Sequence, residues 1–154
     1  MTTATPFPPL APMPPHAPGF ARLHAWLYRV SGGRLGSRFG ARRFLMLTTT
    51  GRKTGARYAN PLEYHIDGQT PYLIASHFGR ERPPAWYLNL LAHPTIEIER
   101  NGGRQWATAR VARAEDRQRL WPQLTLVAPY YARYQRHTVR EIPLVLLYPA
   151  ELAE

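Results

Sequence analysis

The sequence predicts one α+β domain built on a mainly antiparallel β-barrel. Six short segments have the apolar or alternating pattern of strands, and two pairs of them are joined by the hairpin signals Asp67-Gly68 and Asn101-Gly102-Gly103. Helical segments lie between hairpins and do not alternate with single strands, so a parallel βαβ sheet is not indicated. A chain of 154 residues is long enough to bury roughly 70% of its unfolded surface around one core.

The N-terminal residues 1–18 are expected to form a flexible tail, and the domain is expected over residues 19–154. Seven prolines in the tail exclude a helix or a central strand. Residues 20–30 then predict a short amphipathic helix. Its apolar side chains at helical spacing are Phe20, Leu23, Leu27 and Val30. The pattern allows packing against the domain or contact with a membrane surface.

Three strands are predicted in antiparallel order in the first half of the domain. Residues 43–50 form the first strand, and residues 57–66 form the second after a glycine-bounded turn. Pro61 lies inside the second strand and implies an edge position or a bulge. Residues 71–76 follow Asp67-Gly68 as the third strand.

A helix and a second hairpin follow. Residues 77–82 are expected to be a polar loop, and Pro84 is suited to be the first residue of a helix that continues to residue 92. Residues 95–100 and 105–111 have strand patterns on either side of an Asn-Gly-Gly turn.

The C-terminal part predicts two helices and a last strand. Residues 114–120 begin a helix with acidic residues in its first turn, and Pro122 is expected to break or restart it. A further short helical segment lies between residues 129 and 138, and residues 142–148 form a strongly apolar closing strand.

The stretch 47–55, Leu-Thr-Thr-Thr-Gly-Arg-Lys-Thr-Gly, has the composition of an anion-binding turn. It contains Lys53, the only lysine of the chain. Glycines let backbone N–H groups converge, while hydroxyls and a guanidinium complete a set of donors for phosphate or carboxylate. The Walker nucleotide loop is excluded because its glycine spacing is absent. The alternative interpretation is a basic β-turn that only joins two strands.

The charge and residue composition of the chain limit the kinds of partner and cofactor that are expected. A formal net charge of +10 favours a polyanionic partner or cofactor. The arginines are scattered and accompany no DNA-binding motif, so nucleic acid is not expected. Because cysteine is absent, redox chemistry requires a bound cofactor, and the histidines lack metal-ligand spacing. The N-terminus has no signal-peptide pattern, so a cytoplasmic location is expected, with possible membrane association through residues 20–30.

Three segments in this order resemble the deazaflavin-dependent nitroreductases of the split β-barrel flavin-binding superfamily. They are Leu-Thr-Thr-Thr-Gly-Arg-Lys-Thr-Gly at 47–55, Pro-Ala-Trp-Tyr-Leu-Asn-Leu at 84–90, and Tyr-Ala-Arg-Tyr-Gln at 131–135 leading into Arg-Glu-Ile-Pro at 140–143. The resemblance implies an FMN-binding, PNPOx-like split barrel with short flanking helices. It also implies binding of coenzyme F420, an 8-hydroxy-5-deazaflavin with a phosphate and a polyglutamate tail, which serves in its reduced form as hydride donor.

The resemblance also implies a set of cofactor-binding residues. In the phosphate and tail region these are Arg52, Lys53, Thr54 and Arg57. Beside the deazaflavin they are Pro61, Leu62, Ala75, Ser76, His77, Trp86 and Asn89. Substrate-side aromatic walls and candidate proton donors or relays would be Ser76, Tyr131 and Tyr134.

Several of these residues have a competing structural interpretation. Trp86 is equally suited to core packing. Asn89 is the better functional candidate, because an Asn among apolar residues needs hydrogen-bond partners. Tyr131 and Tyr134 project from one helical face and would otherwise be packing residues. His77-Phe78 departs from the family's usual Lys-Gly-Gly type of loop, which leaves the substrate class open.

The leading functional hypothesis is an F420H2-dependent oxidoreductase that passes a hydride to a quinone, a nitroaromatic or a similar conjugated acceptor. One alternative is an FMN-binding oxidoreductase of the same fold, since FMN also carries a phosphate. Another is a non-enzymatic cofactor- or lipid-binding protein at a membrane surface. The oligomeric state, monomer or homodimer, is left open.

Overall fold

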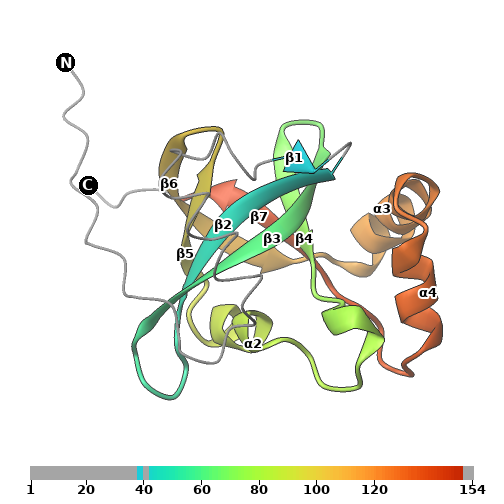
Figure 1. The fold of residues 1–154 in the computed structure, drawn as a ribbon, viewed down its shortest axis with the longest axis horizontal. Helices are drawn as coiled ribbons and strands as arrows, with labels where there is room; N and C mark the ends of the chain where they lie inside the picture. The colour runs from blue at the N-terminus through green and yellow to red at the C-terminus, as the bar shows by residue number, and fades with distance from the viewer. Residues whose placement is uncertain (1–37, 40–41, 151–154) are drawn as a thin grey trace.

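The structure is a computed structural model that describes residues 38–39 and 42–150 (Figure 1). The tail predicted over residues 1–18 and the amphipathic helix predicted over residues 20–30 lie outside these ranges.

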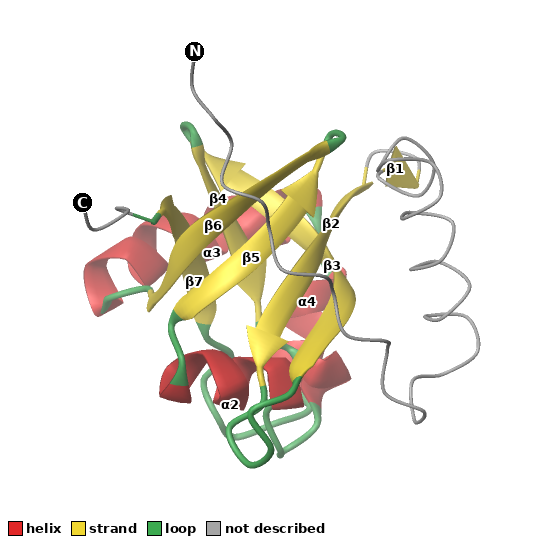
Figure 2. Ribbon diagram, turned by 90° about the vertical axis from the view of Figure 1, so that its left-hand side faces the viewer, coloured by secondary structure: helices red, strands yellow, loops and turns green. Residues whose placement is uncertain are grey.

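The strands of the described ranges form one antiparallel sheet. They are β1 (Arg38–Phe39), β2 (Arg42–Thr50), β3 (Arg57–Asp67), β4 (Thr70–Ile74), β5 (Thr95–Arg100), β6 (Gly103–Val111) and β7 (Leu144–Pro149). Their order is β1-β2-β3-β4-β7-β6-β5, and β2 also pairs with β5. This extra pairing closes β2 to β7 into a barrel (Figure 2) and confirms the predicted antiparallel barrel.

The predicted hairpin turns are present. Gly68, Asn101 and Gly102 all have positive φ, as tight turns at these positions require. Pro61 pairs with Met46 of β2, whereas β4 pairs with β3 only from Tyr64 onward. Pro61 therefore lies where β3 has a partner strand on one side only, which confirms the predicted edge position.

The core has two layers that share β4 and β7. Inside the barrel, Leu45, Leu73 and Val145 pack together with Trp86 from outside the sheet. On the outer face, Leu144 and Leu146 pack with helix residues such as Leu124. Strand residues alternate between these two layers, so both faces of β7 are buried. The unbroken apolar run of the last strand follows from this double burial.

Three α-helices and one 3-10 turn are described. They are the turn η1 (His77–Gly79) and the helices α2 (Ala85–Ala92), α3 (Ala114–Val127) and α4 (Tyr130–Arg136). Helix α2 lies across one end of the barrel, while α3 and α4 lie beside β4 and β7 (Figures 1 and 2). None of these helices is both long and apolar enough to cross a membrane.

Helix boundaries required three corrections. Pro84 is the N-cap of α2 and not its first residue. The segment expected to be a polar loop contains the turn η1. The prediction that Pro122 breaks its helix is wrong, because α3 continues through it. Leu120 and Leu124 are fully buried on either side of Pro122, and their packing offsets the lost hydrogen bond.

Candidate functional site

The basic turn between β2 and β3 is a tight, fixed loop. The Gly51 N–H donates to the Ala56 carbonyl at 2.6 Å, and the Gly55 N–H donates to the Gly51 carbonyl at 2.8 Å. A Cβ on Gly51 would lie 2.5 Å from the ring of Tyr58, so a side chain does not fit there. Lys53 stands exposed at the tip and forms no ion pair within the part of the chain that the structure describes. Its charge is available to an external anion.

Asn89 of α2 anchors this turn to the end of the barrel. Its Oδ1 accepts hydrogen bonds from the Arg52 backbone N–H at 3.2 Å and from the Arg52 guanidinium at 3.0 Å. Its Nδ2 donates to the Thr49 hydroxyl at 3.4 Å. The side chain is buried, so these three bonds meet the polar demand that the sequence predicted for it. Asn89 thereby holds Arg52 in place.

Other residues predicted to bind the cofactor are packed into the protein. Trp86 is 8% exposed and belongs to the core inside the barrel, and Leu62 packs against the same core. These positions favour the packing interpretation of Trp86. The Thr54 hydroxyl lies 3.0 Å from the Tyr58 hydroxyl and accepts from the Ala56 N–H, so it stabilises the turn from within.

Arg57 is held by its own barrel. Its Nη2 donates to Glu97 Oε2 at 2.9 Å, and its guanidinium lies 4.8 Å from the centre of the Trp106 ring. Glu97 is buried, so this charge pair is shielded from solvent. The Arg57 Nε is buried and has no hydrogen-bond partner among the residues that the structure describes. An acidic group of a ligand would have to compete with Glu97 for Arg57, whereas it would meet no such competitor at Lys53.

The segment after β4 is strained and clamped. His77 and Phe78 have φ of 46° and 56°, which side-chain-bearing residues seldom adopt, and Gly79 follows at 78°. Arg140, just before β7, donates to the carbonyls of Ala75, Ser76 and Arg80. These charge-assisted bonds fix the backbone around Ser76.

Turn η1 contacts helix α4 closely. A Cβ on Gly79 would lie 2.5 Å from the Tyr134 carbonyl oxygen, so only glycine allows this approach. Phe78 is 70% exposed, and its ring meets the Tyr134 ring edge-on at a centroid distance of 5.8 Å. The residues after β4 and the α4 tyrosines, far apart in the sequence, therefore lie side by side (Figure 1).

The rings of three tyrosines on α4 pack against one another. They are Tyr130, Tyr131 and Tyr134, which are together called the aromatic row. The centroid of the Tyr131 ring lies 4.7 Å from that of Tyr130 and 6.0 Å from that of Tyr134. Tyr131 is buried, and burial raises its pKa far above the ordinary value. Tyr134 is half-buried and packs beneath Phe78.

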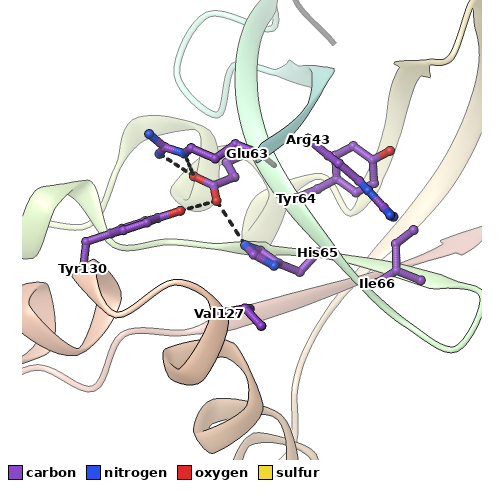
Figure 3. Close-up of a pocket in the computed structure, with 8 residues that line it drawn as sticks. Arg43, Glu63, Tyr64, His65, Ile66, Val127 and Tyr130 are labelled. Carbon is purple, nitrogen blue, oxygen red and sulfur yellow. Dashed lines mark hydrogen bonds and ion pairs between the residues drawn. The ribbon is translucent and has the colours of Figure 1, made fainter. Parts of the chain in front are cut away.

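A charged cluster beside this row was missed by the sequence reasoning. It lines a pocket of about 370 Å³ formed by β2, β3 and the helices, and Glu63 is the shared hydrogen-bond acceptor of the cluster (Figure 3). The pocket residues are Arg42, Arg43, Glu63, Tyr64, His65, Ile66, Val127 and Tyr130. Glu63 and His65 are two apart on one strand and so share a face, which was the only signal in the sequence.

Glu63 is a buried anion that accepts hydrogen bonds from Arg42, His65 and Tyr130. Burial alone raises the pKa of this carboxyl, but hydrogen bonds from His65, Arg42 and Tyr130 lower it to about 2. Arg42 Nε donates to Oε2 at 2.9 Å, and His65 Nε2 lies 3.1 Å from Oε1. The Tyr130 hydroxyl donates to Oε1 in a short hydrogen bond.

Comparison with known proteins identifies the family to which the chain is similar. The family model described as F420H(2)-dependent quinone reductase matches residues 20–149. The chain is 40% identical over 130 residues to an F420H(2)-dependent quinone reductase of Mycobacterium tuberculosis (strain ATCC 25618 / H37Rv), covering 82% of this chain and 87% of that protein.

Solved structures agree. One described as a domain-swapped dimer has a TM-score of 0.64 and 29% identity, covering 81% of this chain and 96% of its own. Another, described as an F420-H2 dependent reductase (FDR-A), has a TM-score of 0.61 and 31% identity, with coverage of 68% and 92%. Together with the family match over most of the chain, these likenesses show that the protein belongs to the F420H(2)-dependent quinone reductase family.

Proposed function

We propose that this protein transfers a hydride from reduced coenzyme F420 to a quinone. Membership of the family makes the chain an F420-dependent reductase with coenzyme F420 as its cofactor. The observation that carries the proposal is the exposed basic turn, fixed by Asn89 at the same end of the barrel as α2.

The donor set of the turn suits F420. Its phosphate and carboxylates need cations and N–H donors that are not already neutralised within the protein. Lys53 is exposed, and Arg52 is held by a neutral amide and not by a carboxylate, so both keep their positive charge for a ligand. We assign the phosphate and tail to Arg52, Lys53 and Thr54, with Arg57 contributing only if it exchanges Glu97 for the ligand.

Bound reduced F420 supplies the hydride, and the protein supplies position, shielding from water and a proton. The clamp from Arg140 holds the backbone of Ser76 in place, and the buried ring of Tyr131 contributes to shielding the site from water. Because burial raises the pKa of Tyr131, this hydroxyl is a weak acid. We therefore favour Tyr134, which is half-buried, or Ser76 as the group that delivers or relays the proton.

A quinone is favoured over a nitroaromatic as the acceptor by the names of the curated relatives. The aromatic row and Phe78 add support, since flat rings suit a flat conjugated acceptor. Because the family depends on F420, F420 is favoured over FMN as the cofactor. The same family match favours an enzyme over the non-enzymatic alternative.

Fluorescence titration of the protein with F420, beside FMN, tests cofactor binding. The Lys53→Ala variant should lose affinity by about tenfold or more, since a charge-assisted bond contributes about 1.5 to 3 kcal/mol. Arg113→Ala, which removes an exposed positive charge at the N-cap of α3, is the matched control and should bind as the wild type does. Equal weakening by both changes would mean that only net charge matters.

The substrate side is tested by Tyr134→Phe. We expect this change to lower turnover of a quinone with F420H2 while the affinity for F420 stays nearly unchanged, because the hydroxyl lies on α4 and not at the basic turn. An equal loss of turnover and of cofactor affinity would contradict the assignment.

A further inference from the structure

The Glu63 cluster is a closed electrostatic unit. Each carboxylate oxygen accepts from two donors: Oε2 takes both bonds from Arg42, and Oε1 takes those from Tyr130 and His65. The side chain of Glu63 is only 6% exposed. A carboxylate saturated in this way has no free acceptor site for a ligand, so it acts on its neighbours and not on a substrate.

Those neighbours hold the aromatic row from two directions. Tyr130, fixed through its hydroxyl, packs against Tyr131 and lies 6.1 Å from Tyr134 between ring centroids. His65, fixed through Nε2, meets the Tyr131 ring edge-on at 6.2 Å. Arg42 lies over the Tyr130 ring at 4.8 Å. Tyr131 thus contacts two rings, those of Tyr130 and His65, that are both hydrogen-bonded to the Glu63 carboxylate.

We propose that Glu63 is a positioning residue for acceptor reduction, which sets the arrangement of the α4 tyrosines through Tyr130 and His65. The proposal rests on the proposed function, in which the tyrosine row faces the acceptor. It adds Glu63, Tyr130 and His65 to a site that the sequence had limited to Ser76, Tyr131 and Tyr134.

The location of the pocket supports this role. Glu63 and His65 come from β3, whereas Tyr130 and Val127 come from the α3–α4 region, so the cluster joins the barrel wall to the helices (Figure 3). A second contact links β3 to α3 at the surface. It is the ion pair between Asp67 and Arg119, which contains two hydrogen bonds. This ion pair joins Asp67, on the same strand as Glu63, to Arg119 of α3, and it contacts no tyrosine of the row in the described hydrogen-bond and ring contacts. It offers a matched comparison.

Glu63→Gln is the central variant. A glutamine cannot satisfy both sides, because its NH2 group must face either Arg42 or the Tyr130 and His65 pair, all of which donate. We expect kcat with F420H2 and a quinone to fall about tenfold to a hundredfold, because small misplacements of catalytic groups cause losses of this size. The affinity for F420 should be unchanged. Asp67→Asn should leave kcat within about twofold of the wild type.

Tyr130→Phe completes a double-mutant cycle and keeps the ring packing. If Glu63 acts through Tyr130, the double variant should be hardly worse than Glu63→Gln alone. Additive losses, equal effects of Glu63→Gln and Asp67→Asn, or a matching loss of F420 affinity would each overturn the proposal.

A spectroscopic readout separates this proposal from the proposed function. Burial and the hydrogen bond to Glu63 raise the pKa of the Tyr130 hydroxyl in the wild type. Its phenolate absorbance should therefore emerge at lower pH in Glu63→Gln, with Tyr130→Phe giving the baseline. An unshifted phenolate titration would sink the link between Glu63 and Tyr130 even in a protein that reduces quinones. Absence of quinone reduction in the wild type, with the shift present, would instead refute the proposed function alone.

Discussion

The basic turn and the Glu63 cluster use positive charge in opposite ways. In the turn, Lys53 is exposed and Arg52 is held by the neutral amide of Asn89, so the charges are open to an external anion. In the cluster, Arg42 forms an ion pair with the buried carboxylate of Glu63, which also accepts hydrogen bonds from Tyr130 and His65. The comparison teaches that a surplus of arginine does not by itself mark a binding surface. What decides is whether a buried carboxylate has already paired with the cation.

Removing both cations of the basic turn tests this difference most strongly. Arg52→Ala with Lys53→Ala should weaken F420 binding by about a hundredfold or more, since two charge-assisted contacts are lost. The unfolding temperature should change little, because the side chain of Lys53 is exposed and that of Arg52 is partly exposed. Fluorescence titration and a melting curve measure the two effects. Unchanged affinity for F420 in the folded double variant would remove the turn from the cofactor site.

Asn89→Ala should affect both stability and cofactor binding. It leaves the Arg52 N–H and the Thr49 hydroxyl without their buried partner, which costs about 1 to 3 kcal/mol of unfolding free energy. Affinity for F420 should fall as Arg52 loses its anchor. Urea unfolding is the measurement, and Gln123→Ala on the exposed face of α3 is the control, with a change below about 0.5 kcal/mol. A destabilised variant with normal affinity would make Asn89 purely structural.

Acid should weaken the Glu63 cluster without any mutation. The pKa of Glu63 is lowered from 4.5 to about 2 in the folded protein, so its stabilisation is complete above pH 4.5 and is lost as the pH falls toward about 2. We expect this carboxylate to account for about 1 to 3 kcal/mol of unfolding free energy over that range.

The difference between the wild type and Glu63→Gln isolates this contribution. Arg119 also lowers the pKa of Asp67, which therefore adds an acid dependence of its own to both proteins, and this part cancels. Parallel stability curves for the two proteins between pH 4.5 and pH 2 would contradict the assignment.

The smallest effect is expected for Thr54→Val. The hydroxyl lies in an exposed turn, where its bonds to Tyr58 and the Ala56 N–H contribute about 0.5 to 1 kcal/mol. F420 affinity should fall by less than about fivefold, as measured by the same titration. A loss as large as that of Lys53→Ala would mean that the Thr54 hydroxyl contributes as much to cofactor binding as the charge of Lys53.

Local features of the sequence predicted most of the barrel because turns and strands are specified by neighbouring residues. Asp67-Gly68 and Asn101-Gly102 supply the positive φ of their hairpins, and alternation supplies the strand faces. Helix α3 was predicted too short because the packing of Leu120 and Leu124 against β-strands distant in the sequence outweighs the local effect of Pro122. The basic turn was recognised for the same local reason as the hairpins.

The sequence by itself determined the barrel, the basic turn and, through resemblance, the cofactor. Only the tertiary structure decided which charged groups are free. Arg57, predicted as a ligand for acidic groups, is paired with Glu97 forty residues away, and Glu63 meets Tyr130 across 67 residues. A side chain's charge is visible in the sequence, but its partner and its burial depend on contacts between distant elements, and these fix whether the charge binds a ligand or positions a neighbour.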